Sequence, residues 1–206
     1  MPYPTKRIHF GSLVFDVNDD VYEPAEDSFL FAENLGLNVG ESVLDLGTGS
    51  GILAVTAAQK AAHVLAVDLN PYAIRCAKEN AKLNHVWGKM DFLQADLFSA
   101  FHSGMRFDLV LFNAPYLPSE AGEEATWIGR SWAGGANGRL VVDRFISEVP
   151  AYLKSGGRVL LMQSTLTGVE ETVSAFAKRG FKAAVTATQQ LPFFETLTLI
   201  EAKAEA

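Results

Sequence analysis

Residues 43–51 read VLDLGTGSG, and this stretch decides the fold. A short apolar run leads into three glycines at alternate positions, Gly47, Gly49 and Gly51. Glycine lets a backbone turn tightly and lets a ligand come close to it. A helix that starts after such a turn presents unpaired amides, and a doubly wound sheet binds nucleotides at a junction of this kind. A tight turn without any ligand is the alternative interpretation.

Strands and helices are predicted to alternate along most of the chain. Strands are expected at residues 42–47, 63–68, 90–96, 107–113, 157–163, 181–188 and 193–202, and helices at 51–62, 71–84, 138–153 and 168–180. This alternation is typical of an α/β fold, in which helices cover both faces of a mostly parallel sheet. The last two strands follow one another without a helix, and Phe194, Thr196 and Thr198 alternate with Leu197 and Leu199, which suggests a hairpin-like end. A final antiparallel strand would make the sheet mixed. We therefore predict a doubly wound, seven-stranded, Rossmann-like sheet whose last strand is antiparallel.

The first 40 residues have a different pattern. A small hairpin is predicted at residues 8–17 and a helix at 23–35, where Pro24, Glu26 and Asp27 suit the first turn. This segment is too short to be a domain. We expect one domain over residues 1–206, with a lead segment (1–40) over the ligand end of a core (41–206).

Composition excludes several classes of protein. The 206 residues are 49% hydrophobic and 20% charged, as in an ordinary globular domain. No apolar run is long enough to span a bilayer, and no apolar signal core opens the chain, so a cytoplasmic protein is expected. The single cysteine and four scattered histidines have no metal-ligand spacing, so no metal site is predicted. A net charge of −7 argues against direct binding of nucleic acid.

Three aspartates lie at the same end of successive predicted strands. Asp45 lies inside the first strand, where a buried carboxylate needs a partner such as a ligand ammonium group. Asp68 ends the second strand and can accept hydrogen bonds from both ribose hydroxyls of an adenosine. Asp96 ends the third strand and can meet the edge of the adenine, with Leu97 on the base. One such acid alone is more often a helix cap, but three favour a nucleoside site.

The spacing of the three glycines and the charge of the turn indicate which kind of nucleotide could bind. A dinucleotide site reads G-x-G-x-x-G, whereas the third glycine comes one residue early here. The turn also has no lysine or arginine to receive a pyrophosphate. An adenosine that carries a sulfonium and an amino acid suits this acidic end, so S-adenosylmethionine is the predicted cofactor.

The sequence NAPY at residues 113–116 directly follows the fourth predicted strand. The side-chain oxygen of Asn113 and the carbonyl of Ala114 can accept the two hydrogens of an amide or amino group. Pro115 fixes the turn, and the ring of Tyr116 can cover a flat group. Two acceptors aimed at an amide nitrogen favour the positive charge that develops there during methyl transfer. A simple strand cap with a packed tyrosine is the alternative.

Several segments together resemble a known family. A resemblance to class I S-adenosylmethionine-dependent methyltransferases of the Asn-Pro-Pro-Tyr type is found in four segments: LDLGTGSG, AVDLNPYAI, QADLF and FNAPY. VYEPAEDSFL and SWAGGANGRLVVDRF resemble the HemK/PrmC family more specifically. Those enzymes methylate the glutamine of the Gly-Gly-Gln motif in class 1 peptide release factors. Because a separate N-terminal substrate domain is missing, the short archaeal and eukaryotic branch fits, and an archaeal source is expected.

The resemblance implies a role for each matching residue. The cofactor site would be lined by Ser28 from the lead helix and by Asp45, Gly47, Gly49, Asp68, Asp96, Leu97 and Asn113. Residues 113–116 would hold the glutamine amide, and residues 132–138 would shape the acceptor entrance. One departure is Ala114, where the family has its first proline; the carbonyl remains, but rigidity is lost.

The short branch often works with a small zinc-binding activator, which would pair with the third-strand edge at residues 90–96. Met90, Phe92 and Leu93 would be exposed there unless a helix covers them. Trp127, Trp132 and the acidic residues Glu120, Glu123 and Glu124 lie near the expected acceptor entrance. For these, ordinary packing and a solvated loop are equally good interpretations.

Four functions remain open at this point. The leading one is a protein-glutamine N-methyltransferase. Other acceptors for the same chemistry are adenine, which the acidic charge disfavours, and lysine, for which no base is evident. A non-catalytic cofactor-binding subunit is the third, favoured only by Ala114. A nicotinamide oxidoreductase is disfavoured by the glycine spacing.

Overall fold

The computed structural model describes residues 5–192 and 195–204. The chain divides into two compact units, residues 1–100 and 101–206. The elements of the first unit, in chain order, are β1 (Thr5–Phe10), β2 (Leu13–Asn18), α1 (Glu26–Glu33), β3 (Ser42–Leu46), α2 (Ile52–Ala58), β4 (His63–Asp68), α3 (Pro71–Leu83), the 3-10 helix η1 (Trp87–Lys89) and β5 (Met90–Gln94). β3, β4 and β5 pair in parallel. β3 and β4 are buried along most of their length, as parallel strands covered on both faces are, whereas β5 is only partly buried.

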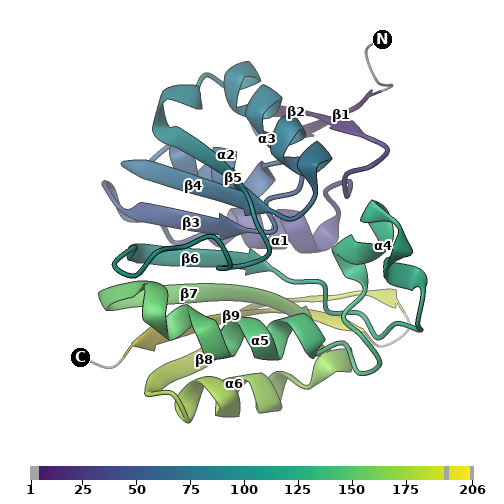
Figure 1. The fold of residues 1–206 in the computed structure, drawn as a ribbon, viewed down its shortest axis with the longest axis vertical. Coiled ribbons are helices and arrows are strands. Elements are labelled where there is room, and N and C mark those ends of the chain that lie inside the picture. The colour runs from purple at the N-terminus through teal and green to yellow at the C-terminus, as the bar shows by residue number, and fades with distance from the viewer. Residues whose placement is uncertain (1–4, 193–194, 205–206) are drawn as a thin grey trace. The chain divides into compact units, whose positions relative to one another are not determined.

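The predicted N-terminal hairpin forms from β1 and β2 and lies beside α3 (Figure 1). Two asparagines on α3 hold it there. Asn80 accepts from the amide of Asp16 at 2.8 Å and donates to its carbonyl at 3.1 Å. Asn84, four residues later and so on the same helix face, makes the same pair of bonds with Val14, at 2.9 and 2.7 Å. The backbone edge of β2 is therefore satisfied by side chains of a helix.

The second unit contains the remaining elements: β6 (Phe107–Asn113), η2 (Glu123–Ala125), α4 (Trp127–Trp132), α5 (Leu140–Glu148), η3 (Val149–Tyr152), β7 (Leu153–Ser164), η4 (Thr165–Thr167), α6 (Val169–Ala177), β8 (Phe181–Gln190) and β9 (Thr196–Ala204). β7 is parallel to β6, whereas β9 is antiparallel to both β7 and β8. Figure 1 shows α5 and α6 side by side, and α6 packs on β8 and β9.

The seven strands follow the order β5-β4-β3-β6-β7-β9-β8, which confirms the predicted mostly parallel sheet with an antiparallel last strand. The predicted apolar/polar alternation in the last strand is wrong. β9 lies between β7 and β8, so Leu197, Thr198, Leu199 and Ile200 are all buried. Phe194, which belonged to that pattern, is outside the described residues.

Several element boundaries differ from prediction. α2 ends at Ala58, four residues before the predicted end of that helix. The helix predicted at 138–153 ends at Glu148, and β7 already begins at Leu153. α4 was not predicted at all. Among the described residues, no helix is both long and apolar enough to cross a membrane. The single-domain organisation over residues 1–206 stays a prediction.

Candidate functional site

The glycine turn of the first unit has the geometry that its sequence predicts. Gly47, Gly49 and Gly51 all have positive φ, at 65°, 53° and 84°, which L side chains rarely adopt. A Cβ at Gly51 would lie 3.0 Å from the Cβ of Ala77, so this glycine lets α2 pack closely on α3. A Cβ at Gly49 would meet only the carbonyl oxygen of Gly47, at 3.9 Å. The turn thus leaves room for a ligand at Gly49 and is tightly packed at Gly51.

Asp45 lies at the base of this turn and is only 1% exposed. It accepts a hydrogen bond from the hydroxyl of Thr48 at 2.7 Å. Burial above all, together with the nearby carboxylate of Asp68, raises the pKa of Asp45 to about 7, although the hydrogen bonds from Thr48 and the Ala54 amide lower it. A cation would favour the ionised form of this carboxyl group. The site therefore suits a positively charged ligand group.

Asp68 connects the end of β4 to the glycine turn. One carboxylate oxygen accepts from the amide of Gly49 at 2.9 Å, and the other accepts from the amide of Asn70 at 2.8 Å. Burial raises the pKa of Asp68 despite these bonds. Each carboxylate oxygen still has a second lone pair for a hydroxyl donor. Asp68 is thus fixed in one orientation beside Gly49. Such a fixed carboxylate is suited to accept hydrogen bonds from two ribose hydroxyls.

Asp96 and Leu97 lie just beyond the end of β5. The amide of Ala95 donates to the carbonyl of Asp68 at 3.0 Å, which places Asp96 next to the end of β4. Leu97 is buried and has a φ of 46°, in the left-handed region that non-glycine residues rarely adopt. Such local strain is frequent at functional sites. Nothing in the sequence indicated this backbone conformation.

The lead segment reaches the same end of the first unit. The side-chain amide of Asn70 donates to the carbonyl of Asp20 at 2.7 Å, so the chain after β2 lies at the end of β4. Ser28 is buried in α1, which packs on α2, and its hydroxyl donates to Asp27 at 3.1 Å. The predicted contact between Ser28 and a cofactor stays a prediction.

In the second unit, residues 113–116 follow directly from β6. Asn113 pairs with Met162 of β7, and the Asn113 side-chain oxygen is buried. Ala114 and Tyr116 are buried, at 3% and 8% exposure, and Pro115 is half-buried. The segment is therefore held firmly in the protein at both ends of its turn.

A second loop, residues 132–138, holds the chain that follows. The amide of Leu117 donates to the carbonyl of Trp132 at 3.0 Å, and the amide of Gly134 donates back to Leu117 at 2.8 Å. The amide of Ser119 donates to the carbonyl of Gly135 at 2.9 Å, and the Ser119 hydroxyl accepts from the Gly135 amide at 3.0 Å. The structure therefore brings together the two segments that the sequence had assigned to one acceptor entrance.

Glycine is required where these two loops touch. A Cβ at Gly138 would lie 2.2 Å from the carbonyl oxygen of Tyr116 and 2.3 Å from Cγ2 of Thr167. A Cβ at Gly134 would lie 2.6 Å from the carbonyl oxygen of Gly138. No real side chain fits at such distances, so the loop lies directly against the backbone of Tyr116.

Other residues near the expected entrance are exposed or half-exposed. Trp127 and Trp132 are half-buried, and Arg130 lies over the ring of Trp127. Glu123 and Glu124 accept hydrogen bonds from nearby backbone amides of the exposed loop, at Glu120 and Gly122. These acids therefore at least shape their own loop.

For the edge strand β5 the sequence left an exposed and a covered interpretation open. Met90 is only 5% exposed, so the covered interpretation holds for this residue. Phe92 and Leu93 are half-buried. Trp87 is 44% exposed and stacks on Phe92, with ring centroids 5.4 Å apart. The apolar residues of this edge are therefore partly covered by the protein and partly exposed to solvent.

Comparison with known proteins identifies the family. A family model described as ribosomal protein L11 methyltransferase matches residues 29–114. A protein of Methanocaldococcus jannaschii named as a protein N5-glutamine methyltransferase is 41% identical over 194 residues, which cover 93% of this chain and 96% of that one. The chain belongs to the HemK/PrmC family of methyltransferases. The human methyltransferase HEMK2 is 32% identical over 206 residues, with 94% and 92% of the two chains covered.

A solved structure of this family is also similar to the present one. It is a chain of the E. cuniculi Mtq2–Trm112 complex, which is responsible for methylation of the translation termination factor eRF1. The TM-score is 0.72 at 25% identity, with 90% of this chain and 99% of that chain covered. In the described part of this HemK/PrmC-family chain, no group of three or more His, Cys, Asp or Glu residues is placed to hold a metal ion.

Proposed function

We propose that this HemK/PrmC-family methyltransferase transfers a methyl group from S-adenosylmethionine to the side-chain amide of the glutamine in the Gly-Gly-Gln motif of a class 1 peptide release factor. One observation carries this proposal. The Asn113–Tyr116 turn is retained and held by the glycine loop at residues 132–138, as a site for a flat amide requires. The similarity to the Methanocaldococcus jannaschii protein named as a protein N5-glutamine methyltransferase supports the same acceptor.

The residues of the first unit fit this cofactor. S-adenosylmethionine, when bound, supplies an electrophilic methyl group on a sulfonium. Asp45 would pair with the ammonium of its amino-acid part, since Thr48 and the Ala54 amide, which donate hydrogen bonds to this buried carboxyl, carry no charge. Asp68 would accept from the ribose hydroxyls, beside the space at Gly49. Asp96 would meet the adenine edge, and Leu97 would pack on the base.

The residues of the second unit would prepare the acceptor. An amide nitrogen is a weak nucleophile because its lone pair is delocalised into the carbonyl group. The side-chain oxygen of Asn113 and the carbonyl of Ala114 would accept its two hydrogens. These bonds strengthen as positive charge develops on the nitrogen, and the proton leaves only after the methyl group has been transferred. The ring of Tyr116 would keep the amide plane in line, so positioning supplies most of the rate.

Ala114 replaces a proline of the family pattern without removing the acceptor atom. Its 3% exposure indicates that packing supplies some of the rigidity that the proline ring would have given. We therefore propose that the chain is catalytic and that it is not merely a cofactor-binding subunit.

The β5 edge is the proposed binding site of a small zinc-binding activator of the Trm112 kind. β5 is the terminal strand of the sheet, and an edge strand offers unpaired backbone groups to a partner. Phe92, Leu93 and Trp87 supply partly exposed apolar surface beside it. A cytoplasmic location, as predicted from the sequence, stays a prediction.

The test is transfer of labelled methyl from S-adenosylmethionine to a purified class 1 release factor, with and without a Trm112 protein. A release factor with the motif glutamine changed to alanine and an adenine-containing oligonucleotide run beside it. Label that disappears with the glutamine change supports the proposal. Label on the oligonucleotide alone, or on the altered release factor, would overturn it.

A further inference from the structure

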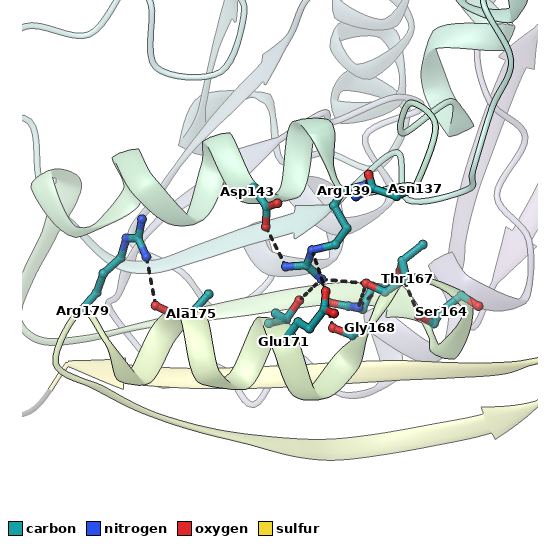
Figure 2. Close-up of polar contacts among 11 residues, drawn as sticks. Asn137, Arg139, Asp143, Ser164, Thr167, Gly168, Glu171, Ala175 and Arg179 are labelled. Carbon is teal, nitrogen blue, oxygen red and sulfur yellow. Dashed lines mark hydrogen bonds and ion pairs between the residues drawn. The ribbon is translucent and has the colours of Figure 1, made fainter.

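Arg139, the residue immediately before α5, is a buried cation with five polar partners. It is 7% exposed. Nη1 donates to the carbonyls of Thr167 at 2.7 Å and Gly168 at 3.0 Å and to the hydroxyl of Thr172 at 3.0 Å. These three partners all lie where η4 leads into α6. Figure 2 shows the side chain of Arg139 reaching from the start of α5 to the start of α6.

Two acids complete the network from the solvent side. Nη2 donates to Asp143 at 2.6 Å, and Nε lies 3.4 Å from Glu171 (Figure 2). The Asp143 and Glu171 side chains are 57% and 71% exposed. A buried guanidinium is costly unless its donors are used, and here all three nitrogens have partners. The planar fork is thus fixed in one orientation against the backbone of Thr167 and Gly168.

The next residue toward the N-terminus, Gly138, connects this network to the proposed acceptor site. A Cβ at Gly138 would clash both with the carbonyl oxygen of Tyr116 and with Cγ2 of Thr167, so Tyr116, Gly138 and Thr167 meet at one point. Arg139 donates a hydrogen bond to the carbonyl of the same Thr167. The backbone of Tyr116 therefore packs against Gly138, and Gly138 packs against Thr167. The hydrogen bond from Arg139 determines how closely Thr167 approaches Gly138.

We infer that Arg139 is a positioning residue for methyl transfer: by fixing loop 132–138 on Thr167, it sets where the Asn113–Tyr116 turn holds the acceptor amide. This inference rests on the proposed function, because it takes that turn as the acceptor site. A shift of about 1 Å in a reacting group is enough to cost roughly 100-fold in rate. If Arg139 only connected α5 to α6, its replacement would change the stability of the protein and leave the rate of methyl transfer unchanged.

The first experiment measures kcat, KM for the release factor and cofactor affinity of two variants. Arg139→Gln removes the charge and the fork, and Arg139→Lys keeps the charge but offers one nitrogen. We expect Arg139→Gln to lower kcat about 10- to 100-fold, with partial recovery in Arg139→Lys. Cofactor affinity should stay within about twofold, because most residues of its proposed site lie at positions 28–97, away from the Arg139 network.

A matched control is available on the same helix pair. Arg179 lies beyond the other end of α6, is exposed, and donates to the carbonyl of Ala175 at 3.1 Å (Figure 2). Arg179→Gln should leave kcat unchanged. If Arg139→Gln does not fold, Asp143→Asn combined with Glu171→Gln loosens the same fork from its exposed side and should lower kcat in the same direction. An unchanged kcat in the folded variants would overturn the inference.

A double-mutant cycle separates positioning from stability. If Arg139 acts through the acceptor turn, the loss from Arg139→Lys should shrink or disappear in an Asn113→Ala background, since the group it aims is gone. Additive losses would contradict the inference. If Asn113→Ala alone leaves kcat unchanged, the proposed acceptor site fails instead, so the two failures are distinguishable.

Amide hydrogen exchange gives a readout that needs no activity. Arg139→Lys should speed exchange about 10-fold at Leu117, Ser119 and Gly134, whose amides connect the two loops. Exchange at the turn amides of Thr48 and Gly51 should stay unchanged. Equal protection of the loop amides in both proteins would mean that Arg139 does not hold the loop.

Discussion

The hydroxyl of Thr48 donates a hydrogen bond of 2.7 Å to Asp45, a carboxyl group that lies almost entirely out of solvent. Burial raises the pKa of Asp45 from 3.8 to about 7. Between these two pH values the folded protein keeps a proton that the unfolded chain has lost. The contribution of Asp45 to stability is therefore complete below about pH 4 and is lost as the pH rises through 7.

The first prediction concerns Asp45→Asn without cofactor. At pH 8 the variant should be more stable than the wild type, by up to roughly 4 kcal/mol at 1.36 kcal/mol per pKa unit, because it avoids a buried charge. At pH 5 the difference should be much smaller. Thermal unfolding at both pH values measures it. Glu79→Gln, on the exposed face of α3, is the control and should give the same difference at both pH values. A pH-independent effect of Asp45→Asn would contradict the argument.

The second prediction concerns proton release on cofactor binding. An ammonium beside Asp45 favours the ionised carboxylate, so S-adenosylmethionine should bind more tightly as the pH rises from about 6 to 8. Binding near pH 6 should release a proton, which calorimetry in buffers of different ionisation enthalpy detects. Asp45→Asn should bind weakly and release none. Equal proton release by wild type and variant would show that another group titrates.

The sequence predicted the sheet better than it predicted the loops. Apolar runs such as residues 107–113 are long enough to specify strands, and Pro71 with Asn70 marks the start of α3, where Asn70 accepts from the Tyr72 amide. The short helix α4 has six residues and no apolar stripe, so its pattern is too weak. Only Thr126, whose hydroxyl accepts from Gly129, indicated a helix start.

Candidate site residues could be named from the sequence where the chemistry of a ligand requires a residue type. Asp45, Asp68 and Asp96 were named because they are acids at the ends of predicted strands, and their contact with a cofactor stays a prediction. Asn80 and Arg139 did not follow, because their roles depend on partners distant in sequence, such as Asp16 and Thr167. Asparagine is an unfavourable residue inside a helix, so its place within the helix predicted at 71–84 was the available signal for Asn80.

The third prediction compares the two asparagines of α3. The Asn80 side chain also donates to the carbonyl of Ser50 at 2.8 Å, so it connects the hairpin to the glycine turn. Asn80→Ala leaves buried backbone groups without partners and should cost about 2–4 kcal/mol in free energy of unfolding. It should also weaken cofactor binding. Asn84→Ala, which does not reach the turn, should cost about 1–2 kcal/mol and leave cofactor affinity unchanged. Denaturant unfolding and cofactor titration check both. Equal effects on affinity would contradict the assigned difference.

The fourth prediction tests the β5 edge. Phe92→Ser removes the ring on which Trp87 stacks, so it should abolish co-purification with a Trm112 protein, while cofactor affinity is retained. Val185→Ser is the matched control: Val185 is 41% exposed on β8, the strand at the opposite end of the sheet order. It should co-purify normally. Retained binding by Phe92→Ser, or lost binding by Val185→Ser, would place the partner elsewhere.

The fifth prediction separates acceptor chemistry from cofactor binding. Asn113→Ala removes one of two acceptors proposed for the glutamine amide and should lower kcat about 100-fold or more, as loss of one preorganised hydrogen-bonding group does elsewhere. Cofactor affinity should change little, because the other groups proposed to hold the cofactor are unaltered. Asp68→Ala should show the opposite pattern, with cofactor affinity weakened most. Single-turnover rates at saturating cofactor measure the first effect, and equilibrium titration measures the second. An Asn113→Ala enzyme with a normal single-turnover rate would exclude the proposed role of this amide in catalysis.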